Sequence, residues 1–166
     1  GQMNPPIREK YHQEELWKGL FDGTINCIAT DHAPHTIQEK NKPYGIAPSG
    51  MPGVETSLPL MLNQVNKGKI TLQDIIKWMC ENPAKIYQIK NKGFIKEGFD
   101  ADIAIVDLNK IKVIRAKNMQ SKCGWSAFEG VKVKGWPIMT IVNGNIVYEN
   151  GSINDKFFGK RTIFND

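Results

Sequence analysis

The chain has 166 residues, of which 40% are hydrophobic, and 22 Lys and Arg against 17 Asp and Glu give a net charge of +5. This length predicts one domain or two small ones with a buried core, and the composition excludes a disordered chain. The lysines are scattered and form no basic stripe interleaved with aromatic residues, so we expect no nucleic-acid partner, although a cationic surface suits an acidic substrate.

Three cysteines, Cys27, Cys80 and Cys123, stand far apart and lack CxxC spacing. This arrangement predicts neither a disulfide framework nor a structural zinc site. No apolar run approaches the length of a membrane span, and the N-terminal residues lack the charged-then-apolar order of a signal peptide. We therefore expect a cytoplasmic protein without a membrane partner.

The first residues predict a loop, a helix and a strand in that order. Asn4-Pro5-Pro6 predicts a loop in which the proline pair holds the Asn4 amide at a fixed angle. Apolar residues in the segment from His12 to Leu20 recur at helical spacing and predict an amphipathic helix that Gly23 closes. Residues 25–30 predict a short buried strand that ends at Asp31.

Asp31 is the residue at which we expect chemistry. In (β/α)₈ barrels the active site lies at the C-terminal ends of the strands, so a carboxylate at the end of a strand is a candidate for chemistry in that fold. Asp31 could bind a divalent metal through its hard oxygen atoms, or pass a proton to and from activated water. The alternative is that Asp31 only begins an Asx-turn before the loop from Asp31 to Gly53. Loops of more than about fifteen residues are usually functional or disordered. The choice between a chemical role and an Asx-turn for Asp31 therefore stays open.

Helical patterns return after this loop. Apolar residues from Leu58 to Val65 predict a helix that ends at Lys67-Gly68. Thr71 predicts the N-cap of a further helix, with Asp74 in place of the usual Glu or Gln of a capping box. Asn82-Pro83 predicts the restart of a short helix with proline in its first turn.

The pattern changes to short strands at about residue 91. The carboxylates of Asp100 and Asp102 could bind a metal ion, but Asp-Ala-Asp before an apolar run is more typical of a turn that leads into a sheet. Residues 103–107 predict a strand buried on both faces. Residues 138–148 predict a hairpin with Asn143-Gly144 at its turn.

Five further side chains have structural interpretations. His12 is expected on the surface, His32 is expected to be structural, and Glu55 is expected to orient the long loop. Trp125 and Trp136 are expected to anchor the core or an interface.

Several motifs together resemble those of one family. The TDHAPHT stretch at residues 30–36, followed by PSGMPGVET at 48–56, resembles the signature of dihydroorotases in the amidohydrolase superfamily. MNPPIR at residues 3–8 is similar to the segment that precedes this signature, and Asn82-Pro83-Ala84 resembles the last helix of amidohydrolase barrels. GFDAD at residues 98–102 resembles the start of the small terminal β domain of the superfamily.

The resemblance implies an α/β fold. The last strand-helix units of a (β/α)₈ barrel are expected in residues 1–90 and a β-rich terminal domain in residues 91–166. A complete barrel needs about 250 residues, so we expect this chain to be a portion of the enzyme it resembles. The expected partners are a small-molecule substrate and the remainder of the dihydroorotase chain, with a homo-oligomer or aspartate transcarbamoylase as further possibilities.

The resemblance also implies the roles of five residues. Asp31 would ligate one zinc ion of a binuclear site and move the proton between the attacking water and the leaving nitrogen. Asn4, His35, Ser49 and Gly50 match positions that hold the substrate carboxylate and ring. The other metal ligands of such a site lie outside this sequence, so we expect the isolated chain to lack a complete metal site and to be inactive.

The implied reaction is the reversible cyclisation of N-carbamoyl-L-aspartate to L-dihydroorotate in de novo pyrimidine biosynthesis. One alternative is another cyclic amidohydrolase, of the allantoinase or hydantoinase type. A second alternative is a non-catalytic dihydroorotase-like subunit that supports a partner enzyme such as aspartate transcarbamoylase.

Overall fold

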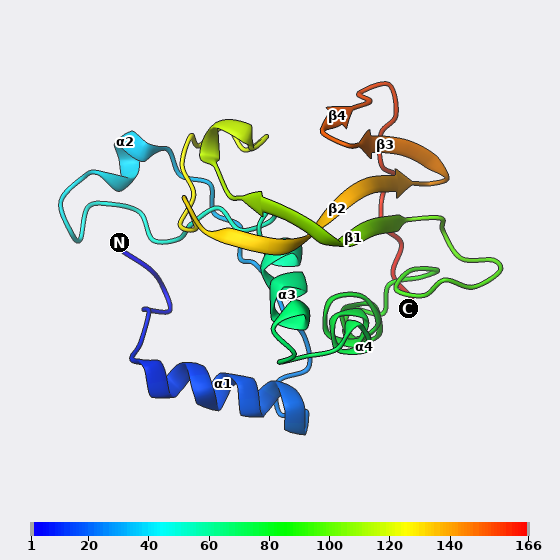
Figure 1. Ribbon diagram of the computed structural model, residues 1–166, viewed down its shortest axis with the longest axis horizontal. Helices are drawn as coiled ribbons and strands as arrows, with labels where there is room; N and C mark the ends of the chain where they lie inside the picture. The colour runs from blue at the N-terminus through cyan, green and yellow to red at the C-terminus, as the bar shows by residue number, and fades with distance from the viewer. Residues whose placement is uncertain (1, 166) are drawn as a thin grey trace.

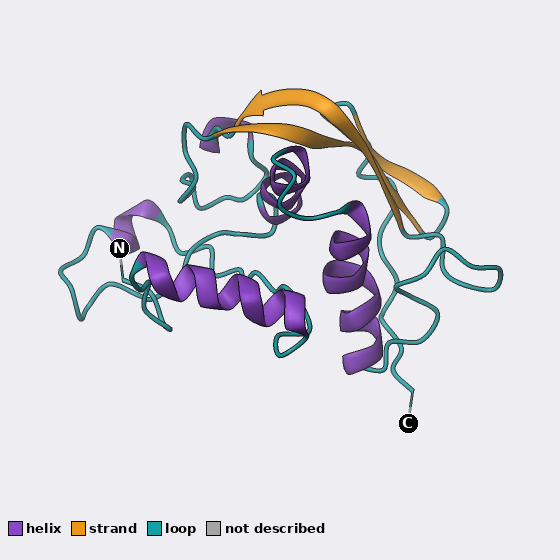
Figure 2. Ribbon diagram, turned by 60° about the horizontal axis from the view of Figure 1, so that its bottom comes forward, coloured by secondary structure: helices purple, strands orange, loops and turns teal. Residues whose placement is uncertain are grey.

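The computed structural model describes residues 2–165. Four antiparallel strands form one sheet in the order β1-β2-β3-β4 (Figure 1). Turning the molecule shows the sheet as a curved layer with the helices on one side of it (Figure 2). Within residues 2–165, no helix is both long and apolar enough to cross a lipid bilayer.

The elements follow the chain in two groups. The helical elements are α1 (Lys10–Asp22), α2 (Ile37–Lys40), α3 (Ser57–Asn66), α4 (Leu72–Ile76), the π-helix η1 (Lys77–Glu81), α5 (Asn82–Ile86) and the 3₁₀ turn η2 (Ala116–Asn118). The strands are β1 (Ile103–Val113), β2 (Lys132–Val142), β3 (Asn145–Glu149) and β4 (Ser152–Ile153).

Helix ends lie where the sequence signals predicted them. Helix α1 ends at Gly23, whose φ of 86° is the left-handed conformation that glycine adopts most readily. Helix α4 begins with a capping box in which the Thr71 hydroxyl accepts from the Asp74 N–H at 3.2 Å. In return the Asp74 carboxylate accepts from the Thr71 N–H at 2.8 Å, so aspartate closes the box that usually takes glutamate.

The predicted restart of a helix at Asn82 is only partly right, because α4, η1 and α5 follow one another without a break. The wider turn of η1 contains Trp78, whose carbonyl accepts a hydrogen bond from the Ile28 N–H at 3.0 Å. The Asn82 side chain donates to the Asn26 carbonyl at 2.6 Å. Both bonds tie the segment before Asp31 to this helical run.

The strand predicted over residues 25–30 is wrong. These residues are extended or bent but form no strand within the described part of the chain. A strand exists only where a neighbouring strand accepts and donates its ladder hydrogen bonds, and here the bonds of Asn26 and Ile28 go to η1 and α5. The predicted burial is not seen either, because residues 25–30 are half-buried or exposed, and strand pairing requires a neighbour that a local apolar pattern does not contain.

The β hairpin is confirmed and the burial of β1 is not. Asn143 and Gly144, with φ of 48° and 80°, form the turn between β2 and β3. Strand β1 was predicted to be buried on both faces, yet Ala104 is exposed and Ile105 is 41% exposed. The prediction fails because helices cover only one face of this antiparallel sheet (Figure 2).

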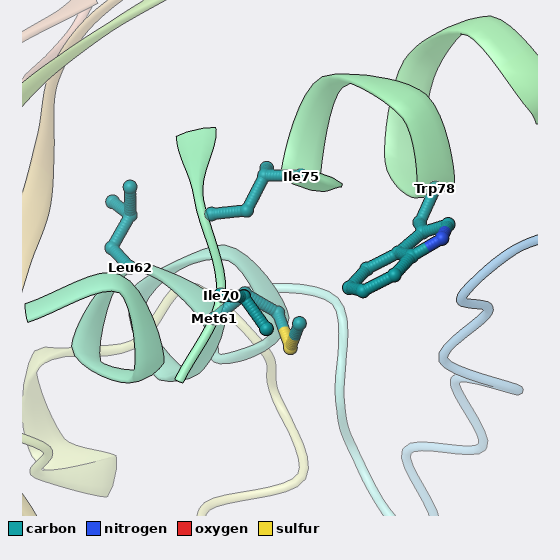
Figure 3. Close-up of a cluster of buried hydrophobic side chains, with 5 residues drawn as sticks. All are labelled: Met61, Leu62, Ile70, Ile75 and Trp78. Carbon is teal, nitrogen blue, oxygen red and sulfur yellow. The ribbon is translucent and has the colours of Figure 1, made fainter. Parts of the chain in front are cut away.

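The core lies between α3, the start of α4 and the sheet. Its buried side chains are Met61, Leu62, Ile70, Ile75 and Trp78 (Figure 3). Val106 and Leu108 of β1 pack against them. Sheet and helix also approach closely at Gly135, because a Cβ atom there would lie 2.6 Å from the Leu62 Cβ. The division of the chain at residue 90 stays a prediction.

Candidate functional site

Three segments that the sequence singled out lie side by side. The Ala33 N–H donates to the Met51 carbonyl at 3.0 Å, and His32 and Met51 form an isolated parallel bridge. The Gly50 N–H donates to the Gln2 carbonyl at 3.3 Å. The backbone thus brings together the segments that carry Asn4, Asp31 to His35, and Ser49-Gly50.

Gly50 is required for this approach. Its φ is +110°, a conformation that residues with a side chain rarely adopt, and the residue is buried. A Cβ atom at this position would lie 2.6 Å from the Ala33 Cβ, well inside van der Waals contact. The glycine of the PSGMPG stretch therefore allows the two halves of the loop to touch.

Asp31 lies exposed where these segments meet. Its φ of 43° is left-handed, which aspartate tolerates better than most residues with a side chain. Such conformations are enriched at functional sites. Within residues 2–165 the structure records no hydrogen bond or ion pair to the Asp31 carboxylate, so the group is available to a ligand.

His35 has a fixed backbone and an uncommitted side chain. Its N–H donates to the Ala33 carbonyl at 2.9 Å, and its carbonyl accepts from the Trp125 indole N–H at 2.7 Å. No partner of its half-buried imidazole occurs among the residues that the structure describes. Asn4 is exposed and follows a similar pattern, since its segment is held through the backbone of Gln2.

His32 differs from its neighbours because its ring is committed to the protein. The imidazole Nδ1 accepts from the N–H of Gly53 at 3.0 Å and from the N–H of Val54 at 3.3 Å. An imidazole nitrogen that accepts is unprotonated, so the remaining proton of neutral His32 lies on Nε2. These bonds tie the start of the loop to its end, which agrees with the expected structural role.

The loop between β1 and β2, residues 114–131, packs against this site. The Glu55 carboxylate accepts from the backbone N–H groups of Gln120 and Ser121, both at 2.9 Å. The Trp125 indole bond connects the same β1–β2 loop to His35 in the loop from Asp31 to Gly53. Glu55 was expected to orient the long loop from Asp31 to Gly53, but its carboxylate instead holds the loop that follows β1.

Sequence reasoning missed the role of Lys40. Its ammonium group donates to the carbonyls of Gln2 at 2.9 Å and Pro48 at 2.8 Å. It also lies 5.9 Å from the centroid of the Trp125 ring, within the range of a cation–π contact. Nothing in the sequence around Lys40 signals these contacts, because each partner is distant along the chain or is a backbone carbonyl.

Helix α2 was also missed, although its signal is present in the sequence. Thr36 and Glu39 have the spacing of a capping box, and the Glu39 carboxylate accepts from the Thr36 N–H at 2.7 Å and its hydroxyl at 2.8 Å. The backbone N–H bond, followed by the hydroxyl bond, lowers the pKa of Glu39 below its ordinary value. The box fixes the chain directly after His35.

The described residues fit one ligand of a metal site. Asp31 offers exposed, hard carboxylate oxygens of the kind that divalent cations accept. Within residues 2–165 there is no group of three His, Cys, Asp or Glu side chains that could hold a metal ion. Asp100 and Asp102 pair instead with the Lys92 ammonium group, which agrees with the turn predicted there.

Comparison with known proteins assigns a family to these residues. The model of the Amidohydrolase family matches residues 8–147. Among curated relatives, the dihydroorotase of Pyrococcus furiosus is 46% identical over 159 residues, which are 96% of this chain and 37% of the relative. The dihydroorotase of Bacillus pumilus is 43% identical over 152 residues, covering 91% of this chain and 35% of the relative. The chain thus spans little more than a third of the length of these relatives.

Solved structures show the same fold. L-hydantoinase from Arthrobacter aurescens superposes with a TM-score of 0.85 at 37% identity, covering 92% of this chain and 35% of the hydantoinase. D-hydantoinase from Thermus sp. superposes with a TM-score of 0.89 at 28% identity, covering 96% of this chain and 36% of the hydantoinase. The predicted fold class, the end of an amidohydrolase barrel followed by a β-rich part, is confirmed.

Proposed function

Since the chain belongs to the Amidohydrolase family, we propose that it is the C-terminal part of a dihydroorotase, which interconverts N-carbamoyl-L-aspartate and L-dihydroorotate. One observation carries the proposal. The segment of Asp31 and His35 and the segment of Asn4 are both hydrogen-bonded through their backbones to Gly50-Met51, while within residues 2–165 none of the three side chains has a recorded partner. The relatives named dihydroorotase, at 43% and 46% identity, support the choice of substrate.

In this proposal Asp31 is the proton carrier. Its carboxylate accepts a proton from the water that attacks the ring amide, and returns it to the ring nitrogen as the C–N bond breaks. A carboxylate suits this role because its oxygen atoms can both accept a proton and return it. Its exposure at the junction of three segments leaves room for the substrate.

His35 and Asn4 would bind the substrate carboxylate, with the Ser49-Gly50 backbone against the ring. An imidazole or amide N–H donates to a carboxylate oxygen, and the bond is strongest when the donor is charged. The Gly50 N–H already donates to Gln2, so the Gly50 carbonyl is the group that would accept from a ring N–H. These contacts fix orientation, which lowers the entropic part of the barrier.

Zinc is the proposed cofactor, with Asp31 as the ligand that this chain contributes and the remaining ligands supplied by the rest of the barrel. Zinc, when bound, supplies Lewis-acid activation of the water and of the ring carbonyl. The barrel remainder is the partner that the proposal requires. We further propose that the whole protein works in pyrimidine biosynthesis in the cytoplasm.

A second candidate is a hydantoinase, because solved structures with that name superpose on 92% to 96% of the chain. The two are separated by giving the full-length protein that contains this chain L-dihydroorotate, hydantoin and allantoin at equal concentrations. The proposal expects the highest kcat/KM for L-dihydroorotate. A higher kcat/KM for hydantoin or allantoin would instead assign the protein as a hydantoinase or an allantoinase. A protein that binds zinc but turns over none of the three substrates would favour a non-catalytic subunit.

A further inference from the structure

Lys40 and Trp125 connect every segment to which the proposed function assigns a substrate contact. Trp125 reaches His35 through its indole N–H, over 2.7 Å. Lys40 reaches the segment of Asn4 through the Gln2 carbonyl and the segment of Ser49 through the Pro48 carbonyl. The two side chains meet, with the ammonium group 5.9 Å from the ring centroid.

We infer that Lys40 and Trp125 together are positioning residues, a brace that sets the orientation of His35 and of the Asn4 and Ser49 segments for substrate. The inference rests on the proposed function for its substrate, but its contacts are independent of that function. Neither side chain is proposed to touch substrate. Trp125 lies in the loop between β1 and β2, so the β-rich part of the chain takes part in shaping the pocket.

The chemistry of the contacts explains why these residue types suit the task. A lysine ammonium group has three donors and no acceptor, so it can hold two carbonyls that would otherwise repel each other. An indole offers one N–H at the edge of a rigid ring, whose face attracts a cation. Both Lys40 and Trp125 are half-buried, which reduces competition from water for these bonds.

Backbone contacts around the brace restrict what can move if it is removed. The Glu55 carboxylate holds Gln120 and Ser121, so the loop of Trp125 stays attached to the segment just before α3 without the indole bond. The Thr36 capping box holds α2 on the other side of His35. Loss of the indole N–H should therefore release His35 locally and leave the fold intact.

The test uses Trp125→Phe in the full-length protein, since phenylalanine keeps a ring and loses the donor. Trp136→Phe is the matched control, because Trp136 in β2 is also half-buried and also lies against a lysine, with the Lys112 ammonium group 4.9 Å from its ring centroid. We expect Trp125→Phe to raise the KM for L-dihydroorotate about three- to tenfold, the loss of one hydrogen bond, with kcat within about twofold of wild type. The control should change neither constant beyond about twofold.

Lys40 gives a second, independent variant. Lys40→Met should raise KM as Trp125→Phe does, and Lys40→Arg should restore much of the loss because it keeps the charge and several donors. If the two residues form one device, the double variant Trp125→Phe/Lys40→Met should raise KM by less than the product of the single effects. Full multiplicativity, with no recovery by arginine, would overturn the brace as a single unit.

Hydrogen–deuterium exchange separates failure of the brace from failure of the proposed function. Peptides covering residues 33–40 should exchange faster in Trp125→Phe than in wild type and in Trp136→Phe. Faster exchange supports the brace even if the wild type does not turn over L-dihydroorotate, in which case the proposed function alone fails. Unchanged exchange at residues 33–40 would overturn the inference whatever the activity.

Discussion

The Nδ1 atom of His32 accepts a hydrogen bond from the backbone N–H of Gly53 at 3.0 Å. This bond spans the long loop, since His32 follows Asp31 directly and Gly53 is buried just before α3. The same nitrogen accepts from Val54, so one ring atom holds two backbone donors. The position of Asp31 therefore depends on the neighbouring imidazole as well as on its own conformation.

His32→Phe should lower the free energy of unfolding by about 1–3 kcal/mol, because the Gly53 N–H loses its acceptor in a buried position. His32→Asn should recover most of this loss, since the asparagine Oδ1 lies where the histidine Nδ1 lies. His32→Gln is the control, because its oxygen corresponds to the other ring nitrogen. Denaturant unfolding measures all three, and equal stability of the Asn and Gln variants would contradict the assigned bond.

Gly50→Ala should destabilise the protein more than Gly98→Ala. Both glycines have positive φ, of 110° and 82°, so both variants carry backbone strain of about 1–2 kcal/mol. Only at Gly50 does the new methyl group meet an obstacle, the Ala33 Cβ at 2.6 Å, whereas nothing lies within 4 Å at Gly98. Overpacking should add about 1–3 kcal/mol. Equal free energies of unfolding for the two variants would show that the loop halves do not touch as described.

The Glu39 capping box predicts a local pH dependence. The Thr36 N–H lowers the folded pKa of Glu39 below its ordinary value of 4.5. A carboxylate with a lowered folded pKa stabilises the fold above its unfolded pKa, and this contribution is lost as the pH falls through the folded pKa. The Thr36 amide resonance should therefore titrate below pH 4.5. The Glu39→Gln variant should lack this titration, and a wild-type midpoint at or above 4.5 would contradict the box.

Sequence signals predicted those parts of the fold that depend on short-range chemistry. Gly23 after α1, the Thr71 cap of α4 and the Asn143-Gly144 turn are each determined by residues within a few positions of one another. Residues 25–30 failed for the opposite reason, because a strand requires a partner that a local pattern does not contain. The exposed face of β1 failed likewise, since its cover depends on helices elsewhere in the chain.

In the candidate site too, the sequence indicated the residues but not the tertiary contacts that hold them. His35, Ser49 and Gly50 were found through resemblance to a family, whereas Asp31 was also indicated by its position after an apolar run, and the roles of all four stay predictions. The contacts that hold them were not predictable, because Trp125 meets His35 across 90 positions of the sequence and Lys40 meets Gln2 across 38. Such contacts arise from tertiary packing, which leaves no periodicity or spacing to read.

The most direct test of the account is the hydrolysis of L-dihydroorotate by the full-length protein and by its Asp31→Asn variant. Asparagine keeps the size of the side chain and removes the basic carboxylate. We expect wild-type turnover and a loss of at least about 10²–10⁴-fold in kcat for the variant, with an unchanged unfolding midpoint, because Asp31 has no recorded partner within residues 2–165 to lose. A variant that kept most of the wild-type activity would contradict the role of Asp31 and with it the proposed site.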